Sequence, residues 1–198
     1  MPAGPLLPGL AAIVGLFSLL WVASLRLRNA SIVDTWWGPG FLVATIVSLG
    51  AASPAHPRAW VAAAAVVLWA VRLAAHIGLR NSGHGEDPRY AAWREQYGAQ
   101  WWWWSYFHVF LLQAVIAWVV SWPVFFAVTR DAAFPTVLDA AGVGLFATGW
   151  LFETVGDWQL ARFKRNPANR GQVFDRGLWK YTRHPNYFGE AVPGGGSA

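Results

Sequence analysis

Residues 6–25 read LLPGLAAIVGLFSLLWVASL, a run that contains no charged side chain. An apolar run of 18 or more residues is long enough to cross the hydrocarbon core of a bilayer, which is about 30 Å thick. No basic segment precedes this run, and it is longer than the apolar region of a signal peptide. We therefore interpret it as a retained membrane helix that ends at Arg26 and Arg28.

Further apolar runs predict an all-α integral membrane protein of about five transmembrane helices. Pro123 is expected to kink the fourth helix, and Thr136 and Asp139 have the spacing of a capping box at the start of the fifth. A polar loop is expected over residues 81–100. The expected helices are approximately 6–25, 32–52, 59–80, 104–128 and 136–164, within a single multi-pass domain 1–190 that is followed by a Gly-rich tail, 191–198.

The composition agrees with a membrane protein and excludes several kinds of site. Hydrophobic residues make up 56% of the 198 residues and charged residues 13%, against about 45–50% and about 25% in soluble domains. The absence of cysteine excludes disulfides and thiolate metal ligands, and no other metal-binding motif occurs, so no metal is expected. The net charge of +5 fits loop arginines facing anionic membrane lipids better than it fits nucleic acid, and the 15 tryptophans fit interfacial belts.

The positions of the basic residues predict the orientation. If the C-terminus is cytoplasmic, all but three of the 15 lysines and arginines fall in cytoplasmic segments. The exceptions are Arg58 and Arg130 outside and Arg72 within a helix. Because cytoplasmic loops carry the excess of positive charge, we expect a multi-pass protein of the cell membrane with its N-terminus outside and its C-terminus in the cytoplasm.

Ionisable residues of the fifth helix fall near its cytoplasmic end. At about 1.5 Å per residue from Thr136, Glu153 lies roughly 25 Å along the helix, Asp157 roughly 31 Å and Lys164 roughly 42 Å. Their spacings of four and eleven residues place the three side chains on one helix face. A charge at mid-membrane costs on the order of 3 kcal/mol. The depth of these three side chains in the membrane is therefore expected to matter.

Charged and polar residues of the second and third helices are expected at the same membrane face. Together with the fifth-helix group they favour a polar pocket that opens to the cytoplasm. Interfacial snorkelling and ion pairs between helices, such as Arg72 with Asp157, are the structural alternative. The second and third helices contribute Asp34, Arg72, His76 and Arg80.

Two segments outside the helices carry further polar groups. The loop GHGEDPRY at residues 83–90 has glycines that could cradle a phosphate, although no strand precedes it. The run GLWKYTRHPNYFGE at residues 177–190 mixes polar, aromatic and basic side chains without a helical or strand period. In this run Lys180 and Arg183 suit phosphate groups, Asn186 can both donate and accept hydrogen bonds, and His184 titrates near neutral pH.

At these residues the sequence resembles the steroid 5-alpha-reductase-like membrane family, in particular its bacterial DUF1295 branch. The resemblance covers residues 34–38, 72–94 and 153–190, and the run RHPNYFGE at 183–190 is its most specific part. It implies a multi-helix membrane enzyme that holds NADPH in a cytoplasm-facing pocket and reduces a carbon–carbon double bond in a steroid-like or other lipid. It also implies a further apolar helix after Glu190, where this chain ends in GGGSA; a natural truncation, a frameshifted end and an engineered end all stay open.

The resemblance also assigns roles to residues. The residues that match cofactor-contacting motifs, or that suit phosphate, are Glu153, Asp157, Lys164, Lys180, Arg183, His184, Asn186, Tyr187 and Glu190. The candidates for a catalytic role are Asp34, His76, Tyr90 and His184. Because Arg-His-Pro-x-Tyr also occurs in sterol reductases and isoprenylcysteine methyltransferases, a methyltransferase that uses S-adenosylmethionine is the second hypothesis. A non-catalytic, truncated membrane protein is the third.

Overall fold

The protein is all-helical in the part of the chain that the computed structural model describes, residues 6–53, 56–83, 85–130, 133–169 and 171–181. Within these residues there is no β-strand. The chain divides into two compact units, residues 1–132 and 133–198, which are described separately below. The single-domain organisation expected from the sequence stays a prediction.

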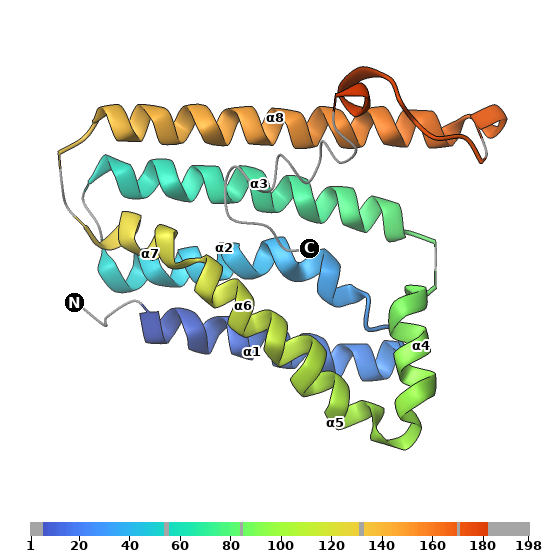
Figure 1. The fold of residues 1–198 in the computed structure, drawn as a ribbon. Helices are drawn as coiled ribbons and strands as arrows, with labels where there is room; N and C mark the ends of the chain where they lie inside the picture. The colour runs from blue at the N-terminus through green and yellow to red at the C-terminus, as the bar shows by residue number, and fades with distance from the viewer. Residues whose placement is uncertain (1–5, 54–55, 84, 131–132, 170, 182–198) are drawn as a thin grey trace. The chain divides into compact units, whose positions relative to one another are not determined.

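The first unit is built from long apolar helices and a chain of shorter ones (Figure 1). Among the described residues, four segments are long and apolar enough to cross a membrane, namely Leu6–Leu27, Ile32–Ala52, Pro57–Asn81 and Pro88–Val120. The elements of this unit are α1 Leu6–Leu27, α2 Ile32–Ala52, α3 Pro57–Asn81, α4 Pro88–Tyr97, η1 Gly98–Gln100, α5 Trp101–Ser105, η2 Tyr106–Leu111, α6 Leu112–Val120 and α7 Trp122–Thr129.

Small residues let the helices of this unit approach closely. A Cβ on Gly38 of α2 would lie 2.9 Å from the carbonyl oxygen of Ala70 in α3, and one on Gly40 would lie 2.9 Å from the Phe17 ring of α1. Such contacts are typical of helix packing in membranes, where close van der Waals packing replaces the hydrophobic driving force. The core of the unit is made of apolar side chains from α1, α2, η2, α6 and α7, including Ile13, Phe17, Val33, Phe41, Val109, Phe110, Ala114, Ala117 and Phe125.

The fourth expected helix is present but interrupted. Residues 106–111 form a turn of π-helix, and the helix breaks at Ser121, whose hydroxyl donates to the Ala117 carbonyl at 2.7 Å. α7 then starts with Pro123 in its first turn, which confirms the expected kink. A proline is accepted there because the first helical amides need no partner within the helix.

The prediction of a polar loop over residues 81–100 is wrong, because most of this segment is helical. Asp87 caps α4 by accepting from the Arg89 amide at 2.9 Å, and Pro88 occupies the first turn. Figure 1 shows α4 lying across the end of the unit at which α1 ends and α2 begins. The Asp-Pro start signal was present in the sequence, but the segment lacks the apolar content on which the prediction relied.

The second unit consists of α8, Val137–Arg165, and a segment that turns back along it. The predicted capping box is confirmed: the Thr136 hydroxyl accepts from the Asp139 amide at 3.2 Å, and the Asp139 carboxylate accepts from the Thr136 amide at 2.8 Å. The helix expected at 136–164 is therefore present, while its spanning of a membrane stays a prediction. The segment after α8 contains two short 3₁₀ turns, η3 Pro167–Asn169 and η4 Gly177–Lys180.

Candidate functional site

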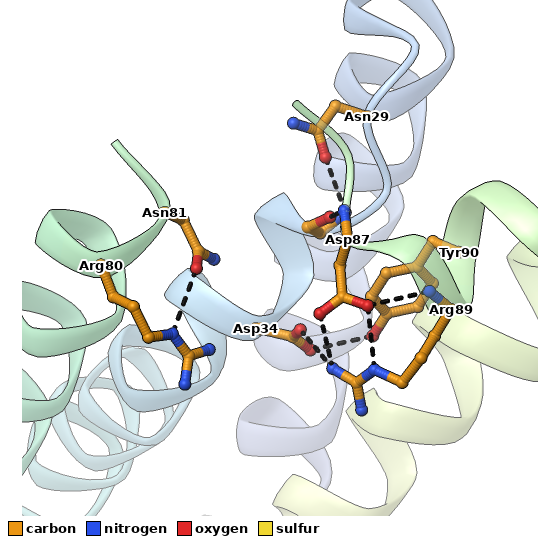
Figure 2. A network of polar contacts seen from close by, with 8 residues as sticks. Asn29, Asp34, Arg80, Asn81, Asp87, Arg89 and Tyr90 are labelled. Carbon is orange, nitrogen blue, oxygen red and sulfur yellow. Dashed lines mark hydrogen bonds and ion pairs between the residues drawn. The ribbon is translucent and has the colours of Figure 1, made fainter. Parts of the chain in front are cut away.

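Asp34 and Tyr90, two of the four catalytic candidates, meet in the first unit. The Tyr90 hydroxyl donates to Asp34 Oδ1 at 2.9 Å, across 56 positions of sequence (Figure 2). Arg89 lies beside them, with its Nη2 3.5 Å from Asp34 Oδ2. Asp34 stands in the first turn of α2, as expected, and Tyr90 is the buried residue of α4. The structure thus brings together a carboxylate and a phenol, a pair that can hold or pass a proton.

The loop before α4 is attached to the turn between α1 and α2 by its two acidic residues. Glu86 Oε1 accepts from the Ala30 amide at 2.6 Å, and both Glu86 oxygens accept from Arg94, at 2.9 and 2.7 Å. The Asp87 amide donates to Ser31 Oγ at 2.6 Å. The Glu86 carboxylate and the Asp87 amide therefore anchor the loop, while the expectation that its glycines cradle a phosphate stays a prediction.

The second acidic residue of the loop is also paired with an arginine. Asp87 Oδ1 and Oδ2 accept from the Arg89 guanidinium at 3.0 and 3.1 Å (Figure 2). The hydrogen bonds from Arg89 hold the pKa of the Asp87 carboxyl below its ordinary value. The lowered pKa favours the ionised carboxylate, whose negative charge also complements the dipole at the start of α4.

The ionisable residues of α8 differ in exposure along the helix. Glu153 and Asp157 are buried, as are Gly149 and Gly156, so that the buried positions follow one helix face. Lys164, near the end of α8, is exposed. The wider pocket expected from the sequence would join Asp34, Arg72, His76 and Arg80 to these residues and stays a prediction. His76 itself is half-buried in α3.

The segment after α8 borders an open hollow of about 480 Å³ at the end of the helix. Its lining combines a lysine, three carboxamides and two aromatic rings, namely Lys164, Asn166, Asn169, Gln172, Phe163 and Phe174, with Leu160, Pro167 and Gly171. The two phenylalanine rings stack with centroids 4.7 Å apart. Cations, amides and aromatic faces are the groups that bind phosphates, base edges and base faces respectively.

Hydrogen bonds to the backbone fix the carboxamides around this hollow. Asn169 Nδ2 donates to the Phe163 carbonyl at 2.8 Å, and Gln172 Nε2 donates to the Ala168 carbonyl at 3.0 Å. Asn166 Oδ1 accepts from the Ala168 amide at 3.1 Å. The lining is thus held by the chain itself. The sequence does not indicate that these carboxamides line a hollow, because short polar loops carry no periodicity.

Comparison with known proteins places the chain in a family. A profile described as "Protein of unknown function (DUF1295)" matches residues 20–193. The chain belongs to this family. A short stretch is also similar to a protein of Ustilaginoidea virens named "Probable O-methyltransferase ustE", with 42% identity over 48 residues, which are 24% of this chain and 17% of that protein. No solved structure matches the chain.

The DUF1295 match, which ends at residue 193, covers residues of both units. Lys180 lies in η4 and is exposed. The predicted residues Arg183, His184, Asn186, Tyr187 and Glu190 lie outside the residues that the structure describes. The assignment of these residues to a cofactor stays a prediction.

Proposed function

We propose that this DUF1295 protein is a membrane-embedded reductase that uses NADPH to reduce a carbon–carbon double bond in a steroid-like or other lipid. The observation that carries the proposal is the hollow at the end of α8, lined by Lys164, three carboxamides and a stacked pair of aromatic rings. The protein would act as an oxidoreductase on CH–CH groups, as a multi-pass protein of the cell membrane with a cytoplasmic C-terminus.

The groups around the hollow fit a phosphorylated dinucleotide. Lys164 lines the hollow, and Arg176 and Lys180 are exposed in the segment after α8, against the single acid Asp175 in the same described stretch. An excess of exposed cations suits a ligand with several phosphate charges. Glu153, Asp157 and the residues of the run 183–190 would complete the contacts that the resemblance to the reductases implies. When bound, NADPH would supply a hydride for transfer to the β-carbon of a conjugated double bond.

Asp34 and Tyr90 are the catalytic candidates among the described residues whose side chains meet, so we assign them the proton side of such a reaction. The Tyr90 hydroxyl is held at 2.9 Å from Asp34. The phenol has one proton to donate, so on substrate binding its hydroxyl would turn from Asp34 to the carbonyl oxygen of the lipid and so polarise the conjugated system. His76 and His184 are the other candidates for this role. The apolar helices around the pair would hold the lipid and exclude water.

A methyltransferase that uses S-adenosylmethionine is the second candidate function. It is favoured by the name of the Ustilaginoidea virens relative, although the similarity covers 17% of that protein. S-adenosylmethionine carries no phosphate, so it would make little use of the exposed cations after residue 163. The number of cations is therefore the feature that favours the reductase over the methyltransferase.

Binding of the two cofactors to the purified protein in detergent tests the proposal. NADPH fluorescence should shift on binding, NADH should bind more weakly, and S-adenosylmethionine should not displace NADPH. Displacement by S-adenosylmethionine, with no preference for NADPH over NADH, would favour the methyltransferase. If the protein binds neither cofactor, the enzymatic reading is wrong and a non-catalytic membrane protein replaces it.

A further inference from the structure

The segment after α8 is attached to the helix by two hydrogen bonds from neighbouring residues. The Leu178 amide donates to Gln159 Oε1 at 3.0 Å, and Trp179 Nε1 donates to the Gly156 carbonyl at 3.1 Å. The two acceptors are three positions apart on α8, so they lie on the same side of the helix. We call this pair of hydrogen bonds the clamp.

A glycine in the backbone and three aromatic rings accommodate the clamp. Gly177 has a φ of +62°, and a Cβ at that position would lie 2.5 Å from Gln159 Oε1, so a side chain there would displace Gln159. The ring of Phe174 lies between two others, stacked on Phe163 at 4.7 Å and 6.1 Å from the ring of Trp179. The clamp is thus joined through Phe174 to the wall of the hollow.

We propose that Gln159 and Trp179 are positioning residues of the cofactor site. They hold residues 177–181 against α8 before any ligand binds, and through Phe174 they hold the wall of the hollow in place. The inference rests on the proposed function, because it gives the clamp a purpose in cofactor binding. Neither residue belongs to the motif residues assigned to the cofactor, and neither needs to contact it.

The clamp affects the affinity for NADPH by setting the fraction of molecules in which residues 177–181 are already held against α8. When only part of the population has the clamp closed, the apparent Kd is the intrinsic Kd divided by that fraction. A segment that must be ordered during binding also lowers affinity, whereas one that is already ordered does not. Breaking the clamp should therefore raise the Kd for NADPH while leaving the rest of the fold intact.

Three variants separate the clamp from simple packing. Gln159→Leu removes the acceptor for the Leu178 amide, whereas Gln159→Glu keeps an oxygen at that place and is the matched control. Trp179→Phe removes the indole N–H but keeps an aromatic ring beside Phe174. We expect the Leu and Phe variants to raise the Kd for NADPH about threefold to tenfold, the range that one neutral hydrogen bond gives. Gln159→Glu should stay within about twofold of the unaltered protein.

The experiment measures NADPH binding and amide hydrogen exchange on the full chain in detergent. The Leu178 amide should be protected in the unaltered protein without NADPH and in Gln159→Glu, and should exchange faster in Gln159→Leu, at equal thermal stability. Equal exchange in Gln159→Leu and the unaltered protein would overturn the clamp itself. Faster exchange without a change in the Kd would overturn its positioning role. If the unaltered protein binds no NADPH, the proposed function fails and the positioning role with it, while the exchange data still decide whether the clamp exists.

Discussion

The loop before α4, with the first turns of that helix, and the segment that follows α8 both gather charged side chains, and they use them differently. In the first, Glu86 and Arg94 pair with each other, and their side chains are 10% and 28% exposed. In the second, Lys164, Arg165, Arg176 and Lys180 are exposed, and Lys164 lines an open hollow. One region satisfies its charges within the protein, and the other presents them to solvent.

The paired charges near α4 stabilise the fold, whereas exposed cations after α8 are accessible to a ligand. Removing one member of a partly buried charge pair leaves the other without its partner, which is costly for stability. Removing an exposed cation changes stability little, because exposed charges are well solvated. Substitutions in the first region should therefore lower stability, and substitution of Lys164, which lines the hollow, should lower binding.

Glu86→Ala should have the largest effect on stability. It removes the acceptor of the Ala30 amide and of the Arg94 guanidinium together. We expect a loss of about 2–3 kcal/mol in the free energy of unfolding, since hydrogen bonds to charged groups are lost. Thermal unfolding in detergent measures it, and Glu95→Ala is the control, because Glu95 is an exposed glutamate of the neighbouring helix α4. A loss as large for Glu95→Ala would remove the distinction between paired and exposed charges.

Gly38→Ala tests the close packing of α2 against α3. The added methyl group would lie 2.9 Å from the Ala70 carbonyl oxygen, a backbone atom that cannot rotate away. Overpacking of this kind costs about 1–3 kcal/mol. Gly142→Ala in α8 is the matched control, because a Cβ there meets no atom within 4 Å. An equal response of the two variants would show that Gly38 is not at a packed contact.

The pH dependence of Asp87 should give the smallest of the stability effects. Because Arg89 lowers the pKa of Asp87 in the folded protein, the stabilisation is present above the ordinary pKa of 3.8. It is lost as the pH falls below that value and the folded carboxyl takes up a proton. Thermal unfolding between pH 6 and pH 3 should therefore show a smaller acid loss for Asp87→Asn than for the unaltered protein. If thermal stability falls equally with pH in Asp87→Asn and in the unaltered protein, the stabilising pair of Asp87 with Arg89 is contradicted.

The long helices could be predicted from the sequence, because length, apolar content and capping residues are local properties. The start of α8 at the Thr136–Asp139 capping box is the clearest case. α4 could not be predicted from apolar content, since its sequence PRYAAWREQY is polar and buries only Tyr90. Its start signal, Asp87-Pro88, was present but was outweighed by the polarity around it.

The sequence could predict single residues of the candidate sites, but not the contacts between them. Asp34 and Tyr90 were both candidates, but nothing in the sequence indicates that their side chains meet across 56 positions. Likewise, Gln159 and Trp179 are ordinary residues until the chain folds back and joins them to the backbone. Contacts between distant residues depend on how elements pack, and the periodicity of one sequence carries no record of that.

The most direct test of the central proposal compares two neighbouring cations at the end of α8. Lys164 lines the hollow, whereas the exposed Arg165 does not. A charge-assisted hydrogen bond contributes about 1.5–3 kcal/mol, and each 1.4 kcal/mol is tenfold in affinity. Lys164→Ala should therefore raise the Kd for NADPH about tenfold or more, and Arg165→Ala should change it less than about twofold. Equal effects of the two substitutions, or no effect of either, would contradict the proposal that this hollow binds the cofactor.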